Sequence, residues 1–102
     1  MTCRYVVHAS VPDELADEWQ LWMQEIHIPR VLSLPWFRGA EMFEEDRTAN
    51  ERRGFVIMYL AADRAAIDSY VSSDECRELR AEFTRRYGDT VLLRREILTP
   101  VS

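Results

Sequence analysis

Hydrophobic and polar residues alternate along the chain with two different periods, and these periods divide it into six segments. A period of two residues, typical of strands, predicts strands over 4–11 and, more loosely, over 36–44, and strands are also expected at the apolar run 54–61 and at 90–98. A period of 3.6 residues predicts helix after the first strand and again over 63–87. This order predicts one α+β domain over 1–102 with the ferredoxin-like βαββαβ fold, in which the helices lie on one face of a four-stranded antiparallel sheet.

The clearest helical pattern follows the first strand. One apolar stripe runs along it, formed by Leu15, Trp19, Trp22, Met23 and Ile26. Ser10 is expected to cap the start of this helix through its hydroxyl group. Pro29 has no amide hydrogen and disfavours helical backbone at Ile28, so we expect the helix to end or kink near His27.

The second helical region contains one cation inside its apolar stripe. Ser72 and Glu75 form a capping box that is expected to restart the helix, and Gly88 is expected to end it. The stripe consists of Cys76, Leu79, Phe83 and Tyr87. At 100° per residue Arg80 falls within it. There are three explanations for a guanidinium group at this apolar position: it reaches solvent, it pairs with a carboxylate, or it binds an anionic ligand. The first two, structural, explanations are preferred.

The third strand is apolar on both of its sides, although the helices can cover only one face of the sheet. Val56, Met58 and Leu60 alternate along it with Phe55, Ile57 and Tyr59, so one of these two apolar sets is expected to have no helix above it. An exposed apolar area of this kind is unfavourable in a monomer. We therefore expect a homodimer that forms through the open sheet face.

The composition excludes several classes of function. The 102 residues include no lysine, and 13 arginines face 18 acidic residues, for a net charge of −5. A pyridoxal Schiff base, a lysine nucleophile and a P-loop are therefore excluded, and the negative charge gives no reason to bind nucleic acid. No apolar run is long enough to cross a membrane. Two isolated cysteines, Cys3 and Cys76, favour a reducing cytoplasm, and no cofactor or metal is expected.

Five residues are candidates for a site. His27 lies beside the first helical stripe, where it can act as a base or simply complement the helix dipole. Trp19 and Trp22 can line an aromatic pocket, although tryptophans at this spacing are more often core residues. Arg80 is the candidate for an anionic group. His8 projects from the opposite side of the first strand, either into an interface or towards the floor of a cavity, and no spacing supports a metal site with His27.

Two stretches of the chain resemble a known family. They are EWQLWMQEIHIPRVLSLPWF (18–37) and LRAEFTRRYGDTVLLRREIL (79–98), with the motifs Trp-x-x-Trp…His-x-Pro and Leu-Arg-Ala-Glu…Tyr-Gly-Asp. They resemble an uncharacterised family, a domain of unknown function, in the dimeric α/β-barrel superfamily, which also holds the antibiotic-biosynthesis monooxygenases. The resemblance implies a ferredoxin-like protomer that dimerises sheet against sheet, and it implies no activity. The chain has Tyr87 where the family pattern leads us to expect phenylalanine.

These observations leave three functional hypotheses. The first is a protein that binds a small aromatic or anionic molecule in a pocket between the helices and the sheet. The second is a cofactor-independent monooxygenase or isomerase that acts on a quinol-like molecule with His27 as base. The third is a purely structural dimer. Haem-degrading members of the superfamily use a strand asparagine and a helix histidine, whereas here the single asparagine is Asn50 in a polar turn and the second helix lacks histidine.

Overall fold

The computed structural model describes residues 2–46 and 51–101, and it has the expected order of strands and helices. The strands are β1 (Cys3–Pro12), β2 (Phe37–Glu44), β3 (Arg52–Ala61) and β4 (Leu92–Leu98). The helices are α1 (Asp13–Trp22), the π-helical segment η1 (Met23–His27), α2 (Ile28–Leu32), α3 (Arg64–Val71) and α4 (Asp74–Tyr87). The polar turn expected over 45–52 joins β2 to β3, and its residues 47–50, Asn50 among them, lie outside the described residues.

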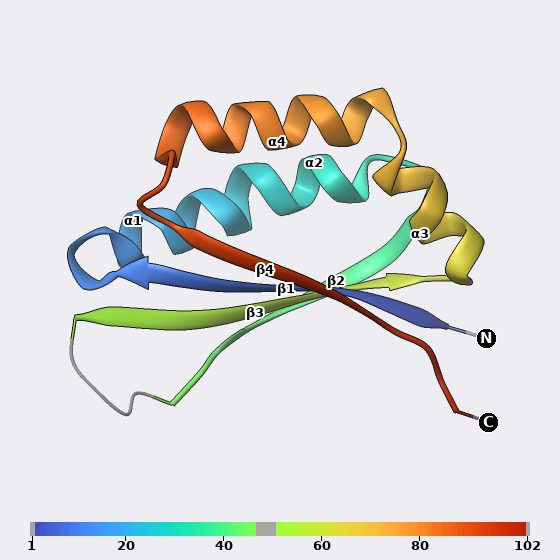
Figure 1. The fold of residues 1–102 in the computed structure, drawn as a ribbon, viewed down its shortest axis with the longest axis horizontal. Helices are drawn as coiled ribbons and strands as arrows, with labels where there is room; N and C mark the ends of the chain where they lie inside the picture. The colour runs from blue at the N-terminus through green and yellow to red at the C-terminus, as the bar shows by residue number, and fades with distance from the viewer. Residues whose placement is uncertain (1, 47–50, 102) are drawn as a thin grey trace.

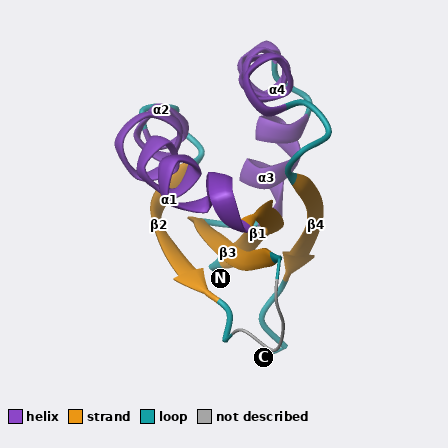
Figure 2. Cartoon of the chain, turned by 90° about the vertical axis from the view of Figure 1, so that its left-hand side faces the viewer, coloured by secondary structure: helices purple, strands orange, loops and turns teal. Residues whose placement is uncertain are grey.

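The four strands form one antiparallel sheet in the order β2-β3-β1-β4. All the helices lie on the same face of this sheet (Figures 1 and 2). The continuous helix α1-η1-α2 covers the side of β2, and α3 with α4 covers the side of β4 (Figure 2). This arrangement confirms the ferredoxin-like α+β fold with helices on one face.

The hydrophobic core fills the space between the helices and the sheet. Tyr5 on β1 pairs with Tyr59 on β3 and with Ile97 on β4, so these three side chains point towards the helices. The same parity places the buried Phe55 and Ile57 on this face. Aromatic rings pack closely here: the ring centroids of Trp19 and Phe55 lie 5.1 Å apart.

The first helix does not end near His27, because it passes through η1 and continues as α2 to Leu32. The irregularity is the π-helical segment itself, whose turn holds more residues than an α-turn and therefore shifts the phase of the following side chains. As a result Ile26, expected in the apolar stripe, is 45% exposed, and His27 packs against Trp22 instead. Pro29 is the second residue of α2, directly after the π-helical segment.

Two expected helix caps are wrong, and one expected helix end is confirmed. The ladder between β1 and β3 continues to Pro12, so Ser10 is still part of the sheet and its hydroxyl accepts a hydrogen bond from Nε of Arg52 at 2.7 Å. The cap of α4 is Ser73 rather than Ser72, because the Ser73 hydroxyl accepts the amide hydrogen of Cys76 at 3.0 Å. Gly88 ends α4 with a φ of +57°.

The second face of the sheet carries apolar side chains that no helix covers. Val6, on this face, is 0% exposed because its paired neighbours Met58 and Glu96 flank it. Phe43 on β2 and Leu92 on β4 are 47% and 57% exposed. Val56, Met58 and Leu60 of β3 share this face and are half-buried, so the apolar surface of the third strand is exposed in part.

Candidate functional site

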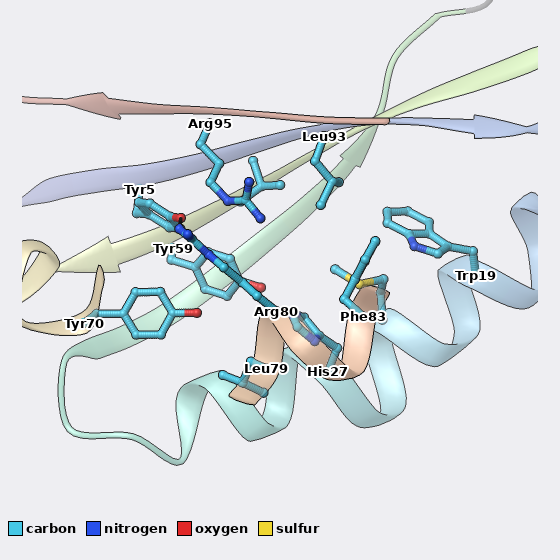
Figure 3. A pocket seen from close by; sticks show the side chains of 12 residues that line it. Tyr5, Trp19, His27, Tyr59, Tyr70, Leu79, Arg80, Phe83, Leu93 and Arg95 are labelled. Atoms are coloured by element: carbon cyan, nitrogen blue, oxygen red, sulfur yellow. Dashed lines mark hydrogen bonds between the residues drawn. The ribbon is translucent and has the colours of Figure 1, made fainter. Parts of the chain in front are cut away.

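A small cavity lies between the sheet, η1 and α4 (Figure 3). Its volume is about 40 Å³, enough for roughly three water molecules. Apolar side chains form most of its wall, and these are Val7, Trp19, Met23, Leu79, Phe83 and Leu93. A closed, filled core around Trp22 and Arg80 would favour a purely structural dimer, and Arg80 instead lines this cavity.

Three tyrosines from different elements turn towards this cavity. Tyr5 comes from β1, Tyr59 from β3 and Tyr70 from α3, and all three rings lie on one side of the cavity in Figure 3. The ring centroids of Tyr5 and Tyr70 are 5.7 Å apart with nearly perpendicular planes. Burial raises the pKa of both Tyr59 and Tyr70 above the usual value of 10. These two phenols are therefore neutral at physiological pH and can donate hydrogen bonds.

Two arginines, Arg80 on α4 and Arg95 on β4, reach the same cavity from opposite sides (Figure 3). Nη2 of Arg80 donates a long hydrogen bond to the hydroxyl of Tyr5 at 3.5 Å. Within residues 2–46 and 51–101, neither guanidinium group forms an ion pair with a carboxylate. The carboxylate partner considered for Arg80 is therefore not found in the described part of the chain.

His27 lines the cavity from η1, held between two aromatic rings. Its imidazole centroid lies 5.1 Å from the indole of Trp22 and 6.1 Å from the ring of Phe83. Nδ1 is buried and has no hydrogen-bond partner among the described residues. Burial lowers the pKa of His27 from 6.5 to about 4; the nearby Glu82 acts against this shift, and the positive charges of Arg30 and Arg95 add to it. The imidazole is therefore neutral at pH 7.

The structure brings together three of the five candidate residues. Trp19, His27 and Arg80 line one cavity. Trp22 does not line it but supports His27 by stacking, and its own ring is covered by Phe83 and by the guanidinium of Arg86 at 5.4 Å. His8 lies on the other face of the sheet, where Nε2 is 2.8 Å from a carboxylate oxygen of Glu96. The cavity therefore does not include His8.

A model of the domain-of-unknown-function family DUF4286 matches residues 2–101 of the chain. The chain belongs to this family. No protein of curated function matches it in a sequence comparison.

Solved structures similar to this DUF4286 protein share its fold. An ethyl tert-butyl ether (EthD) family protein from Bacillus halodurans matches with a TM-score of 0.76 at 13% identity, over 99% of this chain and 100% of the other. A putative antibiotic biosynthesis monooxygenase from Bacillus cereus has a TM-score of 0.72 at 10% identity, over 99% and 94% of the two chains. A point mutant of SnoaB, a cofactor-independent oxygenase from Streptomyces nogalater, gives 0.63 at 12%, over 99% and 94%. At these identities the likenesses show the fold, and they confirm the ferredoxin-like arrangement of the chain.

Four polar residues of the site in the DUF4286 protein were not among the sequence candidates: Tyr5, Tyr59, Tyr70 and Arg95. The parity of β1 already placed Tyr5 on the face of Val7 and Ala9, so its position was accessible from the alternation. The position of Arg95 could not be found from the alternation, because Leu92 and Leu93 are both apolar and do not show which residues of β4 face the helices. Pairing of Arg95 with Val7 settles this question.

Two further features concern metal ions and membranes. In the described ranges, no three or more histidine, cysteine or acidic side chains are arranged so that they can hold a metal ion. None of the described helices is both long enough and apolar enough to pass through a bilayer.

Proposed function

We propose that this DUF4286 protein binds a small molecule with an aromatic or anionic part in the cavity between η1, α4 and the sheet. The observation that carries the proposal is the composition of the cavity: an apolar wall with a few convergent polar groups, from Tyr59, Tyr70, His27 and two arginines. Binding sites for small molecules commonly have this composition. The buried Nδ1 of His27, which has no partner in the described chain, adds a hydrogen-bonding group that a ligand can satisfy.

An aromatic ligand requires the cavity to widen, because about 40 Å³ is far below the ~300–1,000 Å³ of ordinary ligand pockets. The arrangement of the helices permits this. In Figures 1 and 2, α4 stands farther from the sheet than α1 does. Leu79, Arg80 and Phe83 project from α4 into the cavity, so a shift of their side chains enlarges it without breaking hydrogen bonds of the sheet.

The test is a binding measurement with the neutral probe 2-naphthol and a variant that fills the cavity. Val7 lines the cavity, and Val7→Phe is expected to reduce the affinity measured by isothermal titration calorimetry at least tenfold. Leu21→Phe, on the exposed side of α1, is the control and is expected to leave the affinity unchanged. Circular dichroism verifies that both variants fold. Equal binding by the wild type and a folded Val7→Phe variant contradicts the proposal.

A second candidate function is a cofactor-independent monooxygenase that acts on a quinol-like molecule, with His27 as base. Two observations favour it: His27 lines the cavity and its buried Nδ1 has no hydrogen-bond partner in the described chain, and SnoaB, which shares the fold, is a cofactor-independent oxygenase. A pKa of about 4 makes His27 a weak base. Proton removal from a phenol, with a pKa of about 10, therefore needs the two arginines to stabilise the phenolate.

Oxygen uptake with the reduced phenolic probe anthrone distinguishes the two functions. In the reaction the ring supplies the electrons, one atom of O₂ enters the product and the other leaves as water. Uptake above the buffer rate that is lost in His27→Gln and retained in His8→Gln supports the enzyme. Since His8 lies on the other face of the sheet, it is a matched control. Uptake equal to the buffer rate, together with binding of 2-naphthol, supports a binding protein without this activity.

We also propose that two copies of the chain associate through their open sheet faces. The exposed Phe43 and Leu92 flank a central strip formed by Val56, Met58 and Leu60. The hydrogen-bonded pair of His8 and Glu96 lies on the same face, with His8 directly beside Val56. Burial of this surface against a second copy removes apolar area from water, which is the main favourable term in association.

Sedimentation velocity tests the dimer directly. The wild type is expected to sediment as a dimer at micromolar concentration. Val56→Arg places a charge in the centre of the open face and is expected to yield monomers. Leu21→Arg changes an exposed apolar residue on α1 and is expected to leave the dimer intact. A monomeric wild type, or a Val56→Arg variant that remains dimeric, contradicts the proposal.

A cytoplasmic location is proposed from the cysteines. Cys3 and Cys76 are both buried and form no disulfide, which suits a reducing compartment. Fractionation of expressing cells with an antibody against the chain tests this, and recovery outside the cytoplasm contradicts it.

A further inference from the structure

We propose that Arg80 and Arg95 form a two-armed clamp for a carboxylate, so that the ligand is an aromatic monocarboxylate whose ring rests on the apolar wall of the cavity. This inference rests on the proposed function of the cavity as a binding site and specifies the chemical class of its ligand.

The first arm of the clamp is Arg80, whose position in the apolar stripe of α4 turns its side chain towards β1. Its Nη2 reaches the hydroxyl oxygen of Tyr5 at 3.5 Å. A hydrogen bond of this length is weak, so most of the donor capacity of the guanidinium group is unused. The hydroxyl of Tyr5 acts here as acceptor, and its own hydrogen is available to donate to a ligand.

The second arm is Arg95, whose place on β4 is set by the register of the sheet. It pairs with Val7 of β1 and follows Leu93 on the face that the helices cover, whereas its neighbours Arg94 and Glu96 project to the opposite face. Arg95 is therefore a cation on the apolar side of a strand. It lines the inner cavity together with Arg80.

The two arginines also control access to the cavity. Both of them line the inner cavity, and both line the two surface hollows on either side of it, along the seam between α4 and β4. A ligand that approaches by this seam meets the two guanidinium groups first. Their long side chains occupy the mouth, and their movement towards a carboxylate opens space for the ring.

The neighbouring carboxylates are engaged elsewhere. Glu96, which lines one of the surface hollows, bonds to His8 across the opposite sheet face. Glu82 on α4 pairs with Arg30 of α2. Arginine does not lose its proton, and Arg80 and Arg95 are both solvent-exposed residues at the mouth of the cavity, where their two positive charges repel each other and attract an anion. The described chain does not provide this anion, and a ligand carboxylate does.

The form of the site favours a carboxylate attached to a ring over a compact inorganic anion. A carboxylate accepts paired hydrogen bonds from a guanidinium group. Phosphate also accepts paired hydrogen bonds from a guanidinium group, but it has no apolar part that can pack against Phe83 and Leu93 in the cavity wall. The neutral phenol of Tyr59 adds a donor for a second polar substituent on the ring.

The test compares two probes of equal shape, 2-naphthoate and its neutral amide, 2-naphthamide, by isothermal titration calorimetry near neutral pH. The wild type is expected to bind the naphthoate at least tenfold more tightly. Arg80→Met and Arg95→Met are each expected to weaken naphthoate about tenfold and to leave naphthamide within about twofold. Arg77→Met, on the outer side of the same helix, is the control and is expected to change neither affinity.

A salt titration adds a measurement that requires no variant. The affinity of the wild type for naphthoate is expected to fall as NaCl rises from about 0.05 to about 0.5 M, since salt screens charge pairs, whereas the affinity for naphthamide stays constant. Equal affinity for the two probes, or naphthoate binding insensitive to both salt and arginine substitution, overturns the clamp. If the neutral probes still bind and Val7→Phe abolishes their binding, the proposed function survives that result. If neither the naphthalene carboxylate nor the neutral probes bind, both proposals fail together.

Discussion

The indole ring of Trp22 lies against the imidazole of His27, with the ring centroids 5.1 Å apart and the planes inclined by 32°. The two residues are five positions apart and meet because η1 adds a π-helical turn between them. Phe83 of α4 contacts both rings, so the pair also connects the helix α1-η1-α2 to α4. Trp22 thereby fixes the position from which His27 faces the cavity.

Removal of the Trp22 ring is expected to destabilise the protein strongly. Trp22→Ala should lower the free energy of unfolding by about 3–5 kcal/mol, because it removes a buried ring packed against His27, Phe83 and Tyr87. Leu21→Ala, at the adjacent exposed position, should change it by less than about 0.5 kcal/mol. Urea unfolding followed by circular dichroism measures both. Similar losses for the two variants would show that Trp22 is not a core residue.

The stability of the fold is expected to depend on pH through His27. Its pKa falls from 6.5 in the unfolded chain to about 4 in the folded one, so between these values the unfolded state binds an extra proton. The contribution of His27 to the free energy of unfolding is therefore fully present above pH 6.5, and it is lost as the pH falls towards 4. At about 1.4 kcal/mol per pKa unit the loss is about 3 kcal/mol.

The comparison of the wild type with His27→Gln isolates this contribution, since the carboxylates titrate in both proteins. Urea unfolding at pH 7 and at pH 4 is expected to show a smaller loss of stability in the variant. The same loss in both proteins means that His27 is not held neutral by burial.

The cap of α4 is expected to depend on Ser73 and not on its neighbour. Ser73→Ala removes the acceptor of the Cys76 amide hydrogen and should cost about 1 kcal/mol. Ser72→Ala should have a smaller effect, because the Ser72 hydroxyl only donates to the last carbonyl groups of α3, including that of Asp68 at 2.9 Å. Thermal unfolding of the two variants ranks them, and a reversed order contradicts the assignment.

The end of α4 is expected to require glycine. Gly88 has a φ of +57°, where a side chain is strained, so Gly88→Ala should cost about 1–2 kcal/mol. An added Cβ at Gly39 meets no atom within 4 Å, and Gly39→Ala should stay within about 0.5 kcal/mol of the wild type. Denaturant unfolding distinguishes these values. A tolerated Gly88→Ala variant shows that the end of α4 adjusts without strain.

The strands and the paired helices could be predicted because their signals are local. The alternation in β1 and β3 defines which side chains share a face, and Gly88 marks the end of α4 by itself. The cap of α4 could not be predicted, because the adjacent Ser72 and Ser73 have the same hydroxyl group. The position at which α3 ends decides which of the two serines caps α4.

The candidate site could be predicted only in part, because its geometry depends on events beyond one helix or strand. A straight α-helix places Ile26 in the core stripe and His27 at its margin, and the π-helical segment reverses these places. No local sequence pattern predicts a π-helical segment at this position. The meeting of Arg80 with Arg95 depends in addition on the pairing of β4 with β1.

The separation of α4 from the sheet has a consequence for how this scaffold can diversify. The strands hold each other through their own hydrogen-bonded ladders, and α4 joins them mainly through side chains such as Phe83 and Tyr87. Exchange of the α4 positions that face inwards therefore alters the shape and charge of the cavity while the strands that support it stay the same. Libraries randomised at Leu79, Arg80 and Phe83 offer a compact route to new specificities on this fold.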